Sequence, residues 1–294
     1  MIPVVSVVIP AYNRAATISR AIQSVLAQTY QDFELIVVDD GSTDSTCDVV
    51  ATMPDHRIRL LHHEENLGAA AARNTGMTAS NGKYIAWLDS DDEWLPEKLS
   101  IQLQALKLSA PNEKACYTAY ELIEKDISRI YIPEHSDYKK LFLGCDQAPG
   151  SSLLFERSVL DEVGFLDISL RRYEDWDWLL RYCANYHLIA VDQPLVRVHF
   201  TPDRSAAHIE SSALAFVAKY SVPLRQFGIY RNIVISRRWI EVASYYAREH
   251  RPVRLLYFLV KGFFLFPFHH PRVWAWVMNG WLGIKIGSSL VKTD

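Results

Sequence analysis

Short, continuous apolar runs alternate with helical segments along the first part of the chain. Runs rich in Val and Ile, of the kind expected for strands buried on both faces, occupy residues 4–9, 33–38, 58–62 and 84–88. Between them, apolar side chains recur at the spacing of a helix in residues 17–28, 45–53 and 69–78. This order predicts right-handed β-α-β units, and therefore an α/β fold with a mainly parallel sheet flanked by helices.

The alternation continues less regularly in the rest of the chain. A helix, two strands, a helix opened by acidic residues and a strand-like or irregular stretch are predicted at residues 97–108, 115–120, 152–155, 173–185 and 191–200. From about residue 206 the pattern becomes helical and increasingly aromatic. We therefore expect an α/β domain over residues 1–205, with halves at about 1–110 and 111–205, and a helical extension over residues 206–294.

Special residues follow three of the predicted strands. These segments are Pro10-Ala11-Tyr12, Asp39-Asp40 and Asp89-Ser90-Asp91-Asp92. The carboxyl ends of parallel strands share one edge of a sheet, where open α/β sheets bind their ligands. No glycine-rich loop follows the first strand, so a dinucleotide-binding fold or a P-loop has no support from the sequence.

The acidic segment that begins at Asp89 has two interpretations. Taken alone, it is most simply a solvated acidic turn. Three carboxylates at one strand end also repel one another unless a cation or water lies between them. Hard ions such as Mg²⁺ and Mn²⁺ prefer oxygen ligands and often bind through one or two carboxylates together with a substrate's phosphates. The other two strand ends favour this second interpretation.

Charge and cysteine usage narrow the class of protein. The net charge of −3 argues against a general nucleic-acid binder, although residues 220–294 carry 11 Lys and Arg against 3 Asp and Glu. The four cysteines form no Cys-x-x-Cys pair, so neither zinc nor thioredoxin-like chemistry is expected. Reduced thiols in a cytoplasmic compartment fit this pattern best. The first residues lack the charged region of a signal peptide.

Five motifs in this order resemble family 2 glycosyltransferases of the GT-A fold. They are VSVVIPAYNR from Val5, VVDDGSTD from Val37, Asn66-Leu67-Gly68 with Ala72-Arg73-Asn74, DSDD from Asp89, and Glu174-Asp175-Trp176. The resemblance spans about residues 4–205 and does not cover the tail. It implies a nucleotide-diphosphate-sugar donor, an inverting single displacement, and a divalent cation, Mn²⁺ or Mg²⁺, that stabilises the leaving diphosphate.

The resemblance also implies roles at the reacting centre. Asp91 would be the direct metal ligand, and Asp89 would contact the ribose, the metal or its waters. His199 is a further candidate metal ligand; the alternative is a packed or exposed histidine. Asp92 would support the loop or bind sugar hydroxyls, unless it is only a solvated capping acid. Asp175 is the candidate general base, a role that would require burial because a helix N-terminus does not raise a carboxyl pKa.

Further residues are candidates for holding the donor. Asp40, with Asp39 beside it, would read the N–H of a uracil or thymine ring, whereas a turn-forming Asp-Gly is the plainer interpretation. Tyr12 would stack on the base, or else pack in the core. Arg73 would approach the diphosphate, or form a salt bridge with Asp39 or Asp89. Gly68 would permit close approach of the backbone to the donor. The remaining candidates are Pro10, Ala11, Ser90, Glu174 and Arg204.

The C-terminal extension has two interpretations. Its apolar runs at residues 255–260 and 263–266 are too short for a confident membrane-spanning helix. Its tryptophans and basic residues suit a helix lying on an anionic membrane surface, which predicts a peripheral position on the inner face of the cell membrane. The alternative is a helical subdomain or an interface of a homo-oligomer. Peripheral binding would suit a lipid-linked or envelope-glycan acceptor.

The sequence analysis therefore predicts an inverting, metal-dependent glycosyltransferase. Its donor would be a nucleotide sugar, with UDP-sugars favoured, and its acceptor a hydroxyl of a glycan or lipid-linked molecule in surface polysaccharide or glycolipid synthesis. Two other classes stay open at this point. One is a sugar nucleotidyltransferase, which would need a glycine-rich basic loop in place of residues 10–14. The other is a non-catalytic binding or scaffold protein.

Overall fold

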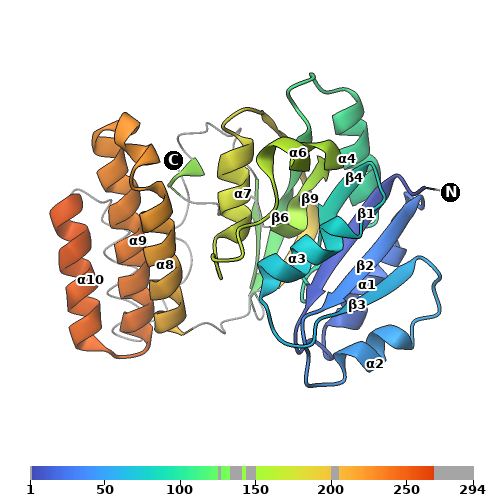
Figure 1. The fold of residues 1–294 in the computed structure, drawn as a ribbon, viewed down its shortest axis with the longest axis horizontal. Coiled ribbons are helices and arrows are strands. Elements are labelled where there is room, and N and C mark those ends of the chain that lie inside the picture. Colours follow the sequence, from blue (N-terminus) through green and yellow to red (C-terminus); the bar gives the residue numbers. More distant parts are fainter. Residues whose placement is uncertain (1, 125–126, 133–140, 144–149, 200–204, 268–294) are drawn as a thin grey trace. The chain divides into compact units, whose positions relative to one another are not determined.

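The computed structural model describes residues 2–124, 127–132, 141–143, 150–199 and 205–267. The chain forms two compact units, Met1–Thr201 and Pro202–Asp294. In Figure 1 the first unit runs from blue to yellow and contains the sheet, and the second is the orange and red group of helices.

The first unit is built on one mixed sheet. Among the described residues it has nine strands in the order β3-β2-β1-β4-β8-β6-β9-β5, with β7 paired to β6. The strands are β1 Val5–Ala11, β2 Phe33–Asp39, β3 Ile58–His62, β4 Tyr84–Trp87, β5 Glu93–Trp94, β6 Ala115–Glu124, β7 Ile127–Tyr131, β8 Leu154–Glu156 and β9 Leu188–His199. The first four are parallel, as the sequence predicted, whereas β8 is antiparallel to both β4 and β6.

Helices cover both faces of this sheet. They are α1 Ile18–Leu26, α2 Thr46–Ala51, α3 Ala69–Thr78, α4 Lys98–Lys107, α6 Leu160–Val163 and α7 Glu174–Tyr182, with 3₁₀ turns η1 Gly150–Ser152 and η2 Arg157–Val159. Alternate residues of β1 face opposite sides: Val5, Val7 and Ile9 join the core beneath α1 and α4, and Val8 joins the core that includes Trp178 of α7. Burial on both faces explains why β1 is apolar at every position except Ser6, whose hydroxyl donates to Glu34 Oε1 at 2.7 Å.

The structure corrects the predicted elements at four places: the end of β1, and the unpredicted elements β5, β7 and α6. The first strand was predicted to end before Pro10, but Pro10 lies inside β1, where it is in register with Val38. β4 accompanies β1 only as far as Val8, so Pro10 has a neighbouring strand on one side only, where its missing N–H is tolerated. The strand β7 was not predicted, and neither were the two-residue strand β5 and the four-residue helix α6, which carry too few residues for a periodic pattern.

The second unit is a group of helices with its own core. They are α8 Ala206–Tyr220, η3 Pro223–Phe227, α9 Ile229–Arg248 and α10 Pro252–Leu265. Helices α9 and α10 approach closely at Gly262, whose carbonyl accepts a 2.6 Å hydrogen bond from Ser236 Oγ. A Cβ at this position would lie 3.0 Å from Ile240 Cγ1. Within the described ranges, no helix combines the length and apolar character needed to cross a membrane.

Candidate active site

The predicted strand ends meet at one edge of the sheet. Ala11 is in register with Asp39 of the neighbouring strand, and the amide of Asp40 donates to the Ala11 carbonyl at 2.7 Å. On the other side of β1, the amide of Leu88 donates to the Val8 carbonyl at 3.1 Å, so the acidic loop begins beside the same edge. The expected convergence of the three segments is therefore present in the fold.

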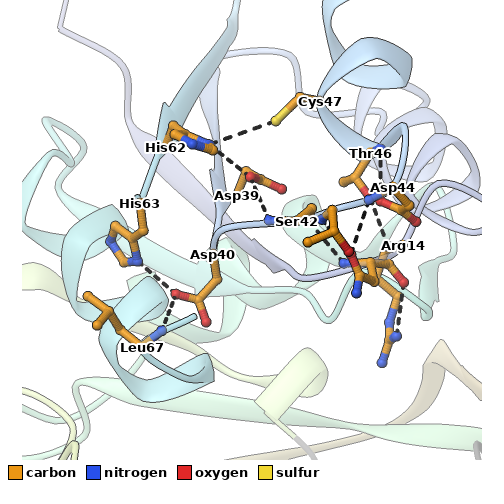
Figure 2. Close-up of polar contacts among 12 residues, drawn as sticks. Arg14, Asp39, Asp40, Ser42, Asp44, Thr46, Cys47, His62, His63 and Leu67 are labelled. Atoms are coloured by element: carbon orange, nitrogen blue, oxygen red, sulfur yellow. Dashed lines mark hydrogen bonds and ion pairs between the residues drawn. The ribbon is translucent and has the colours of Figure 1, made fainter. Parts of the chain in front are cut away.

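The Asp40 carboxylate holds the loop that precedes α3. Its carboxylate accepts hydrogen bonds from the amides of Leu67 at 3.0 Å and Gly68 at 2.7 Å, and His63 Nδ1 lies 2.7 Å from Oδ1 (Figure 2). The residue is 2% exposed. His63 in turn lies 2.9 Å from Thr75 Oγ1 through Nε2. Asp40 thus holds the segment before α3 in place, and His63, which sequence reasoning did not single out, is its partner.

Tyr12 and Gly68 border this edge differently. Tyr12 follows β1 directly and is 41% exposed, so it is not a core residue. Gly68 has φ of 96° at the start of α3, a conformation that favours glycine. A Cβ there would meet no protein atom within 4 Å, so the positive φ accounts for the glycine without any close packing.

Buried and partly buried hydrogen bonds hold the acidic loop to segments distant in sequence. Ser151 of η1 donates through Oγ to Asp92 Oδ2 at 2.6 Å, and the same Oγ accepts from the Asp89 amide at 3.0 Å. The amide of His199 donates to Asp92 Oδ1 at 3.0 Å. Asp92 is only 3% exposed, so it is not a solvated acid, and burial followed by the charge of Asp89 raises its pKa well above the usual range. Ser151 was missed because its partners lie about sixty residues earlier in the chain.

Asp91 is a partly exposed acid of the loop and has two arginines beside it. Its side chain is 16% exposed, and its Oδ2 lies 3.8 Å from Arg14 Nη2. Arg20 of α1 donates to the Asp91 carbonyl. Arg20 therefore holds the backbone at Asp91, while the Asp91 carboxylate lies beside Arg14 and stays partly accessible, as a ligand for a cation requires.

Arg73 links the acidic loop to the helix that carries the candidate base. Its guanidinium pairs with Asp89 through Nη2 and donates to Glu174 Oε1 through Nη1 at 2.8 Å. The side chain is 4% exposed. Burial alone would lower its pKa, but the carboxylates of Asp89, Glu174 and Asp175 outweigh burial and raise it. The predicted salt bridge with Asp89 forms, and the approach of Arg73 to a diphosphate stays a prediction.

Asp175 has the altered acidity that a general base needs. It lies in the first turn of α7, where its Oδ1 accepts from the Trp176 amide at 2.7 Å. Burial and the neighbouring Glu174 charge raise its pKa to about 6, while Arg73 opposes them. The sequence indicated that this acid would need burial to be basic, and the fold supplies it.

His199 and Arg204 are two further candidates from the sequence. His199 Nε2 lies 3.1 Å from Glu93 Oε1, so this ring is engaged next to the acidic loop. In the part of the chain that the structure describes, Asp89, Asp91 and His199 do not gather their ligand atoms into one cluster; the trio that does is Asp39, Cys47 and His62. Arg204 lies outside the described residues.

Sequence comparison settles the family. Residues 6–164 match the family described as glycosyl transferase family 2. The chain is a family 2 glycosyltransferase. It is 36% identical over 179 residues to the Escherichia coli UDP-Glc:alpha-D-GlcNAc-diphosphoundecaprenol beta-1,3-glucosyltransferase WfgD, covering 60% of this chain and 70% of that protein. The Escherichia coli enzyme WfaP, of the same description, is 30% identical over 88% of this glycosyltransferase and 93% of its own length.

Solved structures agree on the fold. S. aureus TarS, in complex with UDP, superposes with a TM-score of 0.57 at 15% identity, covering 94% of this glycosyltransferase and 88% of that chain. The mannosyltransferase PcManGT from Pyrobaculum calidifontis, solved with GDP-Man and Mn²⁺, gives a TM-score of 0.60 at 19% identity, covering 95% and 79%. These likenesses establish the GT-A fold. Family membership also decides against a sugar nucleotidyltransferase and a non-catalytic scaffold.

Proposed function

We propose that this glycosyltransferase moves a sugar from a UDP-sugar, with inversion, to a hydroxyl of a lipid-diphosphate-linked glycan in cell-surface polysaccharide synthesis. The observation that carries the proposal is the position of Asp175, a carboxylate of raised pKa one residue from the Glu174–Arg73–Asp89 link. Two relatives that are named for UDP-glucose and for a diphosphoundecaprenol-linked acceptor support these substrate classes.

In the proposed reaction, an acceptor oxygen forms a bond to the anomeric carbon while the bond from that carbon to the diphosphate breaks. The proton of the acceptor hydroxyl passes to the Asp175 carboxylate, and the electron pair of the broken bond leaves with the nucleoside diphosphate. With a pKa of about 6, Asp175 is mostly ionised at neutral pH and is more basic than an ordinary aspartate.

The acidic loop is the proposed position of a divalent cation. Asp91 and Asp89 offer carboxylate oxygens that suit Mn²⁺ or Mg²⁺, their side chains are 16% and 37% exposed, and His199 is a further candidate ligand. When bound, the ion would stabilise the negative charge on the departing diphosphate. Arg73 holds Asp89, and Ser151 holds the backbone of the loop, so the carboxylates are positioned before the donor arrives.

The edge formed by β1 and β2 is the proposed base-binding region. The partly exposed ring of Tyr12 is available for stacking on a base, and Pro10 and Ala11 form the strand end that supports it. The Asp40 carboxylate, which follows β2, holds the amides of Leu67 and Gly68 in place. A carboxylate can accept four hydrogen bonds, so Asp40 retains capacity to accept from a uracil N–H.

A peripheral membrane contact through α10 is part of the proposal. Its exposed residues include the large apolar side chains Val253, Leu256, Tyr257, Val260 and Phe264. Arg251 and Arg254 lie at the same helix's beginning, which suits an interface with anionic lipid. Such a contact would bring the enzyme to a lipid-linked acceptor on the inner face of the cell membrane.

Turnover by the purified full-length protein tests the function. We expect release of UDP from UDP-sugars to require Mn²⁺ or Mg²⁺ and to rise when a lipid-diphosphate-linked glycan is added. Asp175→Asn should abolish transfer while UDP binding persists, and Asp91→Ala should remove the metal dependence of UDP binding. Activity with GDP-sugars alone would contradict the donor assignment. Unchanged transfer in Asp175→Asn would contradict the assigned base.

A further inference from the structure

A second cluster of ligand-type side chains lies at the outer part of the sheet. Asp39 ends β2, His62 ends β3 in register with it, and Cys47 lies in the first turn of α2, the helix that connects these strands. His62 Nδ1 is 2.9 Å from Asp39 Oδ2 and 3.9 Å from Cys47 Sγ (Figure 2). One ligand atom from each residue lies within 4.8 Å of the other two. The β-α-β connection therefore brings three different ligand types to one point.

The contact pattern is unlike that of a nucleophilic cysteine. In a nucleophile relay, the histidine contacts the nucleophile and the orienting acid through opposite ring nitrogens. Here both Cys47 and Asp39 approach Nδ1 of His62. Burial and the adjacent Asp39 also raise the pKa of Cys47 to about 11, so it is a thiol at neutral pH. The arrangement gives no activation of the sulfur for covalent chemistry.

The Asp39 carboxylate lacks full compensation in the described structure. The residue is 0% exposed. Oδ2 accepts from the Ser42 amide at 3.1 Å and lies beside His62, whereas the buried Oδ1 has no hydrogen-bond partner among the described residues. A buried carboxylate is costly unless it is paired, hydrogen-bonded or bound to a metal. A cation held together with Cys47 and His62 would supply the missing compensation.

We propose that Asp39, Cys47 and His62 bind one Zn²⁺ ion. Thiolate, imidazole and carboxylate are the ligands of zinc, whereas Mg²⁺ and Mn²⁺ prefer oxygen. Zinc bond lengths of about 2.3 Å to sulfur and about 2.0 Å to nitrogen or oxygen imply tetrahedral separations of roughly 3.6 Å and 3.3 Å. The observed 3.9 Å and 2.9 Å differ from these by only a few tenths of an ångström.

Binding would convert the thiol into a ligand without any other reactant. The Zn–S bond forms as Cys47 releases its proton to solvent, and His62 binds through the lone pair of Nδ1 with its proton on Nε2. The His62 side chain is 56% exposed, so the ion can enter from solvent and water can take the fourth position. The sequence alone did not indicate zinc, because the motif Cys-x-x-Cys is absent and these ligands are of three different types.

The position of the site indicates what the ion does. β3 is the edge strand of the sheet, and α2 is a helix of only six residues. Zinc would link β3 and α2 to the end of β2, where the Asp39 carboxylate already accepts a hydrogen bond from the Ser42 amide. The site contains none of the residues assigned to the diphosphate cation. Zinc therefore stabilises this corner of the fold, and its removal leaves the acidic loop intact.

Spectroscopy with Co²⁺ tests the site in the full-length protein. After treatment with a chelator, we expect the wild type to bind one equivalent of Co²⁺ with a thiolate-to-cobalt charge-transfer band that Zn²⁺ displaces. The band should vanish in Cys47→Ser and persist in Cys183→Ser and Asp91→Ala. Since even a partner of a metal ligand is worth about 10- to 100-fold in affinity, His62→Ala should weaken Zn²⁺ binding at least about tenfold.

Thermal unfolding gives an independent readout. Zn²⁺ should raise the Tm of the wild type and of Cys183→Ser increasingly with its concentration, and should leave the Tm of Cys47→Ser unchanged. Absence of a thiolate band in the wild type, or a band that survives Cys47→Ser, would overturn the proposal. An equal effect of Zn²⁺ on the Tm of the wild type and Cys47→Ser would do the same. Neither readout depends on glycosyl transfer.

Discussion

Arg73 donates to Glu174 across 101 residues of sequence, through a 2.8 Å hydrogen bond between Nη1 and Oε1. The same guanidinium pairs with Asp89, so one buried cation connects the acidic loop after β4 with the first turn of α7. Breaking a buried ion pair from one side leaves uncompensated charge and is strongly destabilising. Arg73 therefore couples the proposed metal and base positions both in space and in charge.

Substituting Arg73 with Lys should weaken the link between the acidic loop and the first turn of α7 while it keeps a positive charge there. Lys keeps the positive charge but cannot reach Asp89 and Glu174 together. We expect transfer to fall about a hundredfold, as misplacement of reacting groups does, and the acidic limb of the pH profile to move upward because Arg73 lowers the pKa of Asp175. The pH dependence of kcat/KM measures this. Arg59→Lys, which alters a partly buried pair with Glu34 away from the acidic loop, is the matched control.

The pKa of Asp175 should set the acidic limb of the pH profile of kcat/KM. Its carboxylate must be ionised to take a proton, so kcat/KM should rise with pH and level off above about 6. Its raised pKa also means that the folded state holds more protons than the unfolded state between about pH 4 and 6. Stability contributed by this group is therefore lost as pH rises through that window.

Asp175→Asn should accordingly be inactive and yet somewhat more stable. Removing a carboxylate that burial penalises should raise the free energy of unfolding at pH 7 by at most about 3 kcal/mol. Urea denaturation at pH 5 and 7, with Asp161→Asn on the surface of α6 as a control, measures the difference. An acidic limb that persists in a residually active Asp175→Asn would assign it to another group.

Ser151→Ala should loosen the acidic loop. The substitution removes the donor of a buried hydrogen bond to Asp92 and the acceptor of a partly buried bond from the Asp89 amide. We expect about 1–3 kcal/mol of lost stability and weaker metal-dependent UDP binding, with little change in binding measured without metal. Calorimetric titration with UDP, with and without Mn²⁺, compares the two conditions. Ser158→Ala, on the surface, should match the wild type in both.

Lys98 should make stability depend on pH. Burial lowers its pKa to about 7, although its ammonium lies 3.9 Å from the Trp94 ring centroid and donates to Gln102 Oε1 at 2.7 Å. Above pH 7 the unfolded state holds more protons at this group, so stability should rise by about 2 kcal/mol between pH 7 and 9. Lys98→Met should remove that slope in urea denaturation, whereas Lys107→Met at the end of the same helix should keep it.

The exposed face of α10 should mediate vesicle binding. Leu256→Glu with Phe264→Glu replaces two of its exposed apolar side chains. We expect co-sedimentation with vesicles containing phosphatidylglycerol to fall at least about tenfold, because both buried apolar area and electrostatic attraction are lost. Leu214→Glu changes an exposed leucine of α8 and should bind as the wild type does. A change in oligomeric state instead of vesicle binding would identify the face as a contact between copies.

Much of the first half of the fold could be predicted from its sequence. β3 and α3 have the predicted bounds, and β1, β2 and β4 differ from prediction by no more than two residues at either end. Regular burial produces regular apolar spacing, so such elements are visible in a single chain. The short strand β5 and the serine of η1 are not visible in this way, since their partners are distant in sequence.

The sequence by itself determined the family, the parallel strands and the acids that follow them, because these depend on local composition and spacing. Tertiary structure decided how the acids differ: Asp40 and Asp92 are buried and internally bonded, Asp91 reaches the surface, and Asp175 is made basic by burial. It also placed Arg73 between Asp89 and Glu174, and brought Asp39, Cys47 and His62 to one point. Burial and charge pairing depend on which distant segments pack together, and spacing along one chain does not contain that information.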